Sequence, residues 1–173
     1  MLPVLTTARL TLVPASTVHL ELFSRLNESE AVMRHVTGRP LSPVETSDEW
    51  SRRLGPRTDE ARGLGYWTGF LDPDHFVGWW GLGVPAHEND AGEFGFRIDA
   101  RYWRQGFGSE GGRRVIDYGF SSTDVQRIWA GTATENLASR AALEKLGLRC
   151  VHESEQGRVR YEVTRPEWSG QAA

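Results

Sequence analysis

Three strand-like runs in the middle of the chain constrain its fold more than any other feature. GYWTGFL and HFVGWWGLGV are rich in aromatic residues, and the turn-forming DPD of Asp72–Asp74 separates them. A second turn, HENDAG, leads into EFGFRID over Glu93–Asp99. Short runs that are joined by turns rather than by helices pair with their neighbours in antiparallel order. The sequence therefore predicts an antiparallel meander from residue 65 to residue 99.

Helical patterns precede this meander. An alternating run over Ala8–Ala15 predicts a strand, and Ser16 after it is the expected N-cap of a helix. A short second helix is expected to end at Gly38, and the capping box SPVE of Ser42–Glu45 begins a third that stops at Gly55. The apolar stripe of the first helix is predicted to hold Val18, Leu22, Phe23 and Leu26.

The second half of the chain alternates between helix and strand. The periodicity is helical over 108–120, strand-like over 125–133, helical over 136–147 and hairpin-like over 148–164. No repeat or low-complexity linker divides the chain, so residues 1–168 are expected to form one domain and residues 169–173 a disordered tail. With 173 residues, of which 39% are hydrophobic, the chain can bury one substantial core.

Composition argues against several classes of partner. The formal net charge is −3 without a basic block, so nucleic acid is not expected as a partner. Cys150 is the only cysteine, which rules out an intramolecular disulfide and fits a cytoplasmic location. The longest apolar run, Phe76–Ala86, is too short and glycine-rich to span a bilayer, so we expect a soluble protein without a membrane partner. No metal site is predicted.

The segment YWRQGFGSEGGRR carries Gly106, Gly108 and Gly111 in a G-x-G-x-x-G pattern. In a dinucleotide-binding domain, the first of these glycines follows directly on a parallel strand. Here the six residues ARYWRQ separate Asp99 from Gly106, and only about sixty residues follow, too few for a doubly wound sheet. A phosphate-binding P-loop is excluded because Lys and Ser or Thr do not follow Gly111.

The glycine segment nevertheless suits an anionic ligand. A helix that opens near Gly108 presents unpaired backbone N–H groups with partial positive charge, and glycines let a phosphate approach the backbone. Arg104, with Arg101 or Arg113, can add charge-assisted contacts. The alternative is that the glycines only form a turn and the arginines only face solvent.

A second motif makes the assignment more specific. ATENLASRAALEKLGL places Asn136 and Ser139 three residues apart at the start of a helix, with Leu143 further along it. Together, W-R-Q-G-F-G-S-E-G and N-L-A-S-R-A-A-L-E-K-L-G-L resemble the two acyl-CoA-binding motifs of the GNAT superfamily of N-acetyltransferases. T-A-R-L-T-L-V-P and E-F-G-F-R-I-D further resemble the branch that includes ribosomal-protein alanine N-acetyltransferases. The segment from about residue 27 to residue 64 is the part of the chain that this resemblance covers least.

The resemblance implies an α/β (α+β) fold in which helices flank one mixed, mostly antiparallel sheet of about six or seven strands. It also implies acetyl-CoA as co-substrate, with its pyrophosphate on the glycine loop. Trp103 stands where the superfamily usually has Arg or Gln, so the next two residues are expected to contribute instead. The residues implied in cofactor binding are Arg97, Ile98, Arg104, Gln105, Gly106, Phe107, Gly108, Ser109, Asn136 and Ser139.

Acetyl transfer requires a neutral amine, stabilisation of the thioester oxyanion and a proton for the leaving thiolate. The resemblance implies that a backbone N–H near Arg97–Asp99 polarises the thioester carbonyl, where the strand splays from its neighbour. Glu93 is the candidate general base, or else a surface glutamate at a strand end. Many relatives use a tyrosine as the acid where Leu143 stands here, so Ser139 is the remaining candidate donor to the sulfur. Ser139 is otherwise an ordinary helix residue, and Asn136 a simple N-cap.

Aromatic residues and glycines add two packing predictions. Trp79 and Trp80 face opposite sides of one strand, so at least one belongs to the core and the other can line a pocket. Gly111 and Gly112 each cost a helix about 1 kcal/mol relative to alanine, which indicates close packing against the sheet. Trp67 also lies on a strand of the meander, and the weaker candidates for acceptor contacts are His75, His87 and Glu88.

The function predicted from the sequence is transfer of the acetyl group of acetyl-CoA to a primary amine by direct attack in a ternary complex. The acceptor is expected to be a small-molecule amine or a peptide N-terminus, and the protein a monomer or homodimer. A non-catalytic acyl-CoA-binding or sensory module on the same scaffold is the main alternative, and an NAD-binding domain is a third interpretation.

Overall fold

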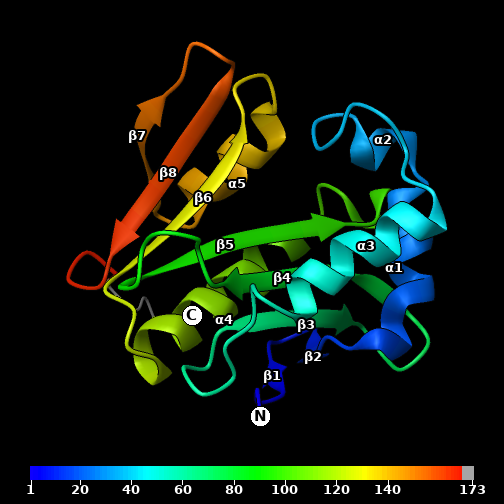
Figure 1. The fold of residues 1–173 in the computed structure, drawn as a ribbon, viewed down its shortest axis with the longest axis horizontal. Helices are drawn as coiled ribbons and strands as arrows, with labels where there is room; N and C mark the ends of the chain where they lie inside the picture. Colours follow the sequence, from blue (N-terminus) through cyan, green and yellow to red (C-terminus); the bar gives the residue numbers. More distant parts are fainter. Residues whose placement is uncertain (169–173) are drawn as a thin grey trace.

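The computed structural model describes residues 1–168, and one eight-stranded sheet forms its centre in the order β1-β2-β3-β4-β5-β6-β8-β7 (Figure 1). Neighbouring strands are antiparallel except β5 and β6, which are parallel. The mixed, mostly antiparallel sheet is confirmed, with a strand more than expected because the short β1 extends its edge. The strands are β1 Leu5–Thr6, β2 Thr11–Pro14, β3 Gly65–Phe70, β4 Phe76–Gly83, β5 Ala91–Ile98, β6 Arg127–Ala133, β7 Arg149–Glu153 and β8 Arg158–Thr164.

Helices lie on both faces of this sheet (Figure 1). The capping box of Ser42 and Glu45 forms as predicted, with Pro43 in the first turn and Gly55 at the end of α3. None of the helices within residues 1–168 combines the length and apolar character of a membrane span, and the predicted tail lies outside these residues. The helices are α1 Leu20–Asn27, α2 Glu30–Met33, α3 Pro43–Leu54, α4 Phe107–Ser122 and α5 Leu137–Lys145, with 3₁₀ turns η1 Thr17–His19 and η2 Ala100–Tyr102.

The predicted stripe of the first helix is wrong at one position. Phe23 and Leu26 are buried and Leu22 is half-buried, but the side chain of Val18 is 81% exposed. Val18 lies in η1, which has about three residues per turn, so the apolar face of α1 does not continue through it.

The two tryptophans of β4 mark two separate cores. Trp80 packs beneath α4 on one face, whereas Trp79 belongs to a cluster with Trp50 of α3 and Tyr66 on the other face. Both side chains are buried, as the alternation of a strand requires.

The glycines inside α4 let this helix approach the sheet closely. A Cβ atom on Gly111 would lie 2.4 Å from Cε2 of Trp80, and one on Gly112 would lie 3.0 Å from Cζ of Phe94. The predicted packing role of both glycines is confirmed.

The sheet opens between its two parallel strands. The pairing of β5 with β6 covers only Ala91–Glu93, opposite Arg127–Trp129. Beyond Glu93 the strands diverge, as Figure 1 shows, and β6 instead continues its pairing with β8. The predicted splay is therefore present, and it leaves one edge of residues 94–98 without a strand partner among residues 1–168.

Candidate active site

The glycine loop ends in a left-handed turn at the start of α4. Gly106 is the N-cap residue with φ of 85°, a conformation that glycine adopts without strain. A Cβ atom there would meet nothing closer than 3.5 Å, so the backbone is accessible. The first-turn N–H groups of α4, a helix of 16 residues, have no acceptor within the helix. These features suit the pyrophosphate of a coenzyme A ligand.

The N-terminal segment holds this loop in place. The guanidinium of Arg9 donates to the carbonyl of Gln105 at 3.0 Å and to Oε2 of Glu110 at 2.7 Å, and lies 4.0 Å from the ring centre of Phe107. Burial would raise the pKa of Glu110, but hydrogen bonds from Thr7 and Arg9 hold it below its usual value. No motif linked Arg9 to the loop, because about a hundred residues separate the two in the chain.

Several predicted cofactor residues are engaged within the protein. Phe107 is buried, and the side-chain amide of Gln105 donates to the carbonyl of Arg101 at 3.0 Å. A Cβ atom on Gly108 would lie 3.1 Å from Cε2 of Phe96, so this glycine also serves packing. Arg104 remains exposed, as a contact with a bound anion requires.

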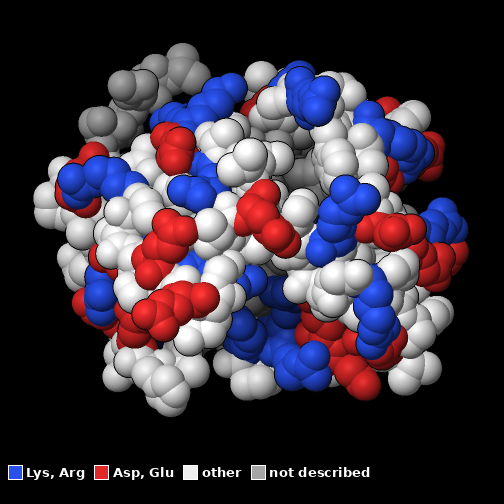
Figure 2. Space-filling view, turned by 90° about the horizontal axis from the view of Figure 1, so that it is seen from above, with Lys and Arg blue, Asp and Glu red and all other residues white. Residues whose placement is uncertain are grey.

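A cavity of about 240 Å³ lies at the opening between β5 and β6. It brings together Glu93, Arg97, Asn136 and Ser139, which the sequence predicted from two separate segments. The remaining lining residues are His35, Val36, Arg53, Trp79, Phe94, Gly95, Phe96, Ala130, Gly131, Thr132, Leu143 and Arg158. Seen from above, the molecule is hollowed between two lobes, with a group of Lys and Arg side chains at one edge of the hollow (Figure 2).

Strand alternation divides this cavity between the two faces of the sheet. Arg97 contacts Glu49 of α3, and Glu93 shares its side of β5. Phe94 and Phe96 instead face the core beneath α4. Residues from both faces line one cavity, so it passes through the sheet where the strands part.

Glu93 lies on the α3 side of the cavity. Its side chain is 29% exposed and accepts a hydrogen bond from Arg57, which follows α3. Glu93 is therefore a half-buried, ion-paired group on a cavity wall rather than a freely solvated residue at a strand end.

The backbone of β5 narrows the range of candidate oxyanion donors. Asp99 N–H donates to the carbonyl of Val77 at 2.9 Å, so by strand alternation the N–H of Arg97 also points toward β4. The N–H groups of Phe96 and Ile98 then point toward the opening. The carbonyl of Ile98 on this open edge accepts a hydrogen bond of 2.8 Å from Nε1 of Trp103.

The side chain of Arg97 belongs to a buried ion network. It donates to both carboxylate oxygens of Glu49, at 3.1 and 3.2 Å, and to Asn27. Burial raises the pKa of Glu49, but the charges of Arg97 and Arg53 outweigh it and lower that pKa to about 2. Burial lowers the pKa of Arg97. No motif indicated Glu49 and Arg53, although their four-residue spacing fits one helix face.

The α5 wall of the cavity carries the remaining predicted pair. Oδ1 of Asn136 accepts the N–H of Ser139 at 3.2 Å, so the N-cap interpretation of Asn136 is confirmed. Leu143 is buried below them and presents an apolar surface. Ser139 is half-buried and lines the cavity.

The weaker acceptor candidates lie elsewhere. His75 pairs with Asp72, and Glu88 pairs with Arg160. Trp67 of the meander is buried and donates to the carbonyl of Pro3. Trp79 does line the cavity, but the histidine there is His35, which no motif indicated.

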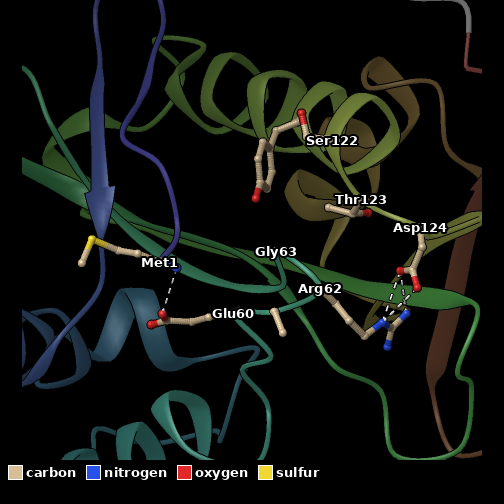
Figure 3. A pocket seen from close by; sticks show the side chains of 9 residues that line it. Met1, Glu60, Arg62, Gly63, Ser122, Thr123 and Asp124 are labelled. Atoms are coloured by element: carbon tan, nitrogen blue, oxygen red, sulfur yellow. Dashed lines mark hydrogen bonds and ion pairs between the residues drawn. The ribbon is translucent and has the colours of Figure 1, made fainter.

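A second hollow, of about 400 Å³, lies at the opposite end of α4 (Figure 3). Met1 pairs with Glu60 across it at 3.4 Å, and Arg62 with Asp124 at 2.9 Å. A helix of 16 residues is about 24 Å long, so this hollow is remote from the glycine loop. It contains none of the predicted site residues.

The chain matches the Acetyltransferase (GNAT) domain over residues 9–149. It is 36% identical to the FsC-acetyl coenzyme A-N(2)-transacetylase of Aspergillus fumigatus, in an alignment that covers 96% of this chain and 78% of that protein. The chain therefore belongs to the GNAT family and is an acetyl-CoA-dependent N-acetyltransferase.

Two solved structures share the fold. The spermidine N-acetyltransferase of Vibrio cholerae in complex with CoA and spermine has a TM-score of 0.74 and 17% identity, and the alignment covers 92% of this chain and 98% of that one. A ribosomal L7/L12 alpha-N-protein acetyltransferase in complex with coenzyme A has a TM-score of 0.72 and 19% identity, with coverage of 94% and 97%. The predicted enzyme class is confirmed, and the NAD-binding interpretation is wrong.

Proposed function

We propose that this enzyme acetylates a primary amine by direct attack within a ternary complex, with Glu93 as general base. The observation that carries the proposal is that Glu93 and Ser139 line the same cavity. Proximity of two bound reactants in such a cavity supplies a large part of the rate enhancement.

The proposed cofactor site combines the glycine loop with α5. The backbone N–H groups of Phe107, Gly108 and Ser109 receive the pyrophosphate, and Arg104 adds a charged contact. The side chain of Asn136 caps α5, which leaves its amide group for a pantetheine contact. Bound acetyl-CoA supplies an acetyl group that is activated as a thioester.

The proposed chemistry assigns each step to a group of this chain. Glu93 takes the proton of the amine, directly or through water, while the new C–N bond forms. The N–H of Phe96 or Ile98 stabilises the oxyanion on the open edge of β5. As the C–S bond breaks, the hydroxyl of Ser139 donates a hydrogen bond to the sulfur. Ser139 is assigned this role because the side chain of Leu143 has no proton to donate.

The acceptor is proposed to be a small-molecule amine or a peptide N-terminus. The relative from Aspergillus fumigatus is named for an N(2) acceptor, and the two solved relatives for spermidine and a ribosomal protein. The ribosomal-protein branch is supported by the segments 7–14 and 93–99.

Steady-state kinetics test the order of events. The release of CoA thiol is measured while acetyl-CoA and an amine are varied together. Direct attack predicts intersecting double-reciprocal lines, whereas parallel lines would indicate a covalent acetyl-enzyme and contradict the proposal.

A further inference from the structure

The side chains that line the cavity carry more positive than negative charge. Within the described part of the chain, three arginines line the cavity, namely Arg53, Arg97 and Arg158, against one carboxylate, that of Glu93. Glu93 is already paired with Arg57 outside the lining. The positive charges of the three lining arginines are therefore not balanced by Glu93.

Glu49 neutralises only one of the two arginines that it contacts. Its Oε1 accepts hydrogen bonds from Arg53 and Arg97, at 2.9 and 3.1 Å, and its Oε2 accepts from Arg97 and Asn27. Both carboxylate oxygens are thus occupied. Two largely buried guanidinium groups share one carboxylate, and a buried charge without a counterion is costly.

Arg53 is the member of this network that is short of an acceptor. Its Nε is buried and has no hydrogen-bond partner within residues 1–168. Its guanidinium lies 4.5 Å from the ring centre of Trp79, which holds it at the cavity wall. A ligand cannot reach this buried Nε, so a ligand oxygen would instead bind Nη1 of Arg53, from which no residue within 1–168 accepts a hydrogen bond.

Arg158 supplies a second cation from another wall. It lies at the start of β8, is exposed, and reaches over Gly131 of β6, where its Nη2 would be 3.6 Å from an added Cβ atom. Among the ion pairs of residues 1–168, none involves Arg158. Two different elements thus present cations to the same space.

We propose that the acceptor amine carries a carboxylate a few bonds from its nitrogen, and that Arg53 and Arg158 bind this carboxylate. The inference rests on the proposed function, because it assumes that the amine is bound near Glu93. Arg53 and Glu93 are both on the α3 side of the sheet, so one small amino acid can reach both. A polyamine finds surplus positive charge here and is a poor acceptor.

Matched acceptors test this assignment. CoA thiol release is measured with L-leucine, with L-leucinamide and with spermine at the same pH. The amide has the more acidic ammonium group, so more of it is neutral and intrinsic reactivity favours it. We nevertheless expect L-leucine to give a kcat/KM higher by about tenfold or more, because the site is built to pair with its carboxylate.

Variants locate the effect. Arg53→Gln and Arg158→Gln should each lower the preference for L-leucine over L-leucinamide by about tenfold, the scale of one lost charged contact. Arg52→Gln is the matched control, because Arg52 is the exposed neighbour of Arg53 on α3 and does not line the cavity. It should leave the preference unchanged.

The outcomes separate the two proposals. Equal or better turnover of L-leucinamide or spermine overturns the carboxylate site and leaves the transferase proposal intact. An equal change in Arg52→Gln also overturns it. If no acceptor is acetylated, the proposed function fails, and calorimetry with the CoA complex still decides the inference. Binding of L-leucine that is tighter than that of L-leucinamide, and lost in Arg53→Gln, supports it, while equal binding refutes it.

Discussion

Arg57 and Glu93 form an ion pair between the end of α3 and β5, at the edge of the cavity. The carbonyl of Arg57 also accepts the N–H of Val84 at 2.9 Å, which fixes the arginine next to the sheet. The pair engages one oxygen of Glu93, Oε2. Arg57 thus positions the carboxylate, and the other oxygen can take a proton.

Glu93→Gln should lower kcat/KM by roughly 10²–10⁴, the range typical of general acid–base catalysis, while the affinity for acetyl-CoA changes little. The deficit should narrow as pH rises, because more of the acceptor is then neutral and needs less help. Thiol-release kinetics between neutral and alkaline pH, with calorimetry for acetyl-CoA, provide the measurement.

Glu162→Gln is the control for this substitution. Glu162 is also a half-buried glutamate paired with an arginine, Arg160, but it does not line the cavity. It should retain wild-type kinetics. A loss in Glu93→Gln that does not vary with pH would assign Glu93 to positioning of the acceptor, and wild-type rates at every pH would remove it from the site.

CoA should raise the melting temperature by about 5 to 10 °C at a hundredfold excess over its Kd, because only the folded state binds it. Pantetheine, which lacks the pyrophosphate, should do much less if the glycine loop binds phosphate. Thermal shift with CoA, pantetheine, ATP and NAD makes the comparison. An NAD shift equal to that of CoA would contradict the assignment of the loop.

Gly106→Ala should weaken CoA binding far more than Gly157→Ala, although both place alanine in a left-handed conformation. Their φ values are 85° and 73°, so each substitution costs roughly 1–2 kcal/mol in backbone strain. Only Gly106 lies in the loop proposed to bind the pyrophosphate. Calorimetric Kd values and denaturant unfolding separate the two effects, and equal Kd values would support a purely structural turn.

Local sequence signals predicted most of the fold. The capping box of Ser42–Glu45, the turn at Asp72–Asp74 and the alternation of β4 each depend on neighbouring residues, and each is found in the structure. The prediction for Val18 was wrong because Val18 lies in a 3₁₀ turn. With about three residues per turn instead of 3.6, this turn points the Val18 side chain away from the apolar face of the following α-helix.

The site was less accessible to sequence reasoning because its contacts join distant segments. Motifs indicated Glu93, Asn136 and Ser139, and all of them line the cavity. Arg57 and Arg53 lie in the region that the resemblance covered least, and a lone arginine on a helix carries no sign of its partner. These charges come together only because α3 packs against β5 in the folded protein.

The ion network beneath the cavity also contributes to the pH dependence of stability. Glu49 has a pKa of about 2 in the folded protein, against about 4.5 in an unfolded chain. Between these values the unfolded state binds more protons than the folded state, so the free energy of unfolding falls as pH falls. The contribution of Glu49 is therefore present above about pH 4.5 and is lost toward pH 2.

Glu49→Gln should lower the free energy of unfolding at neutral pH by about 3 kcal/mol or more, because it leaves Arg53 and Arg97 without their carboxylate. It should also flatten the decline below about pH 4.5 that the wild type shows. Glu45→Gln is the matched control, since the pKa of Glu45 is likewise about 2 but its partner, Arg39, is exposed. Water and salt screen that pair, so its loss should matter less. Urea unfolding at several pH values measures both variants, and equal losses would show that the buried network does not govern acid stability.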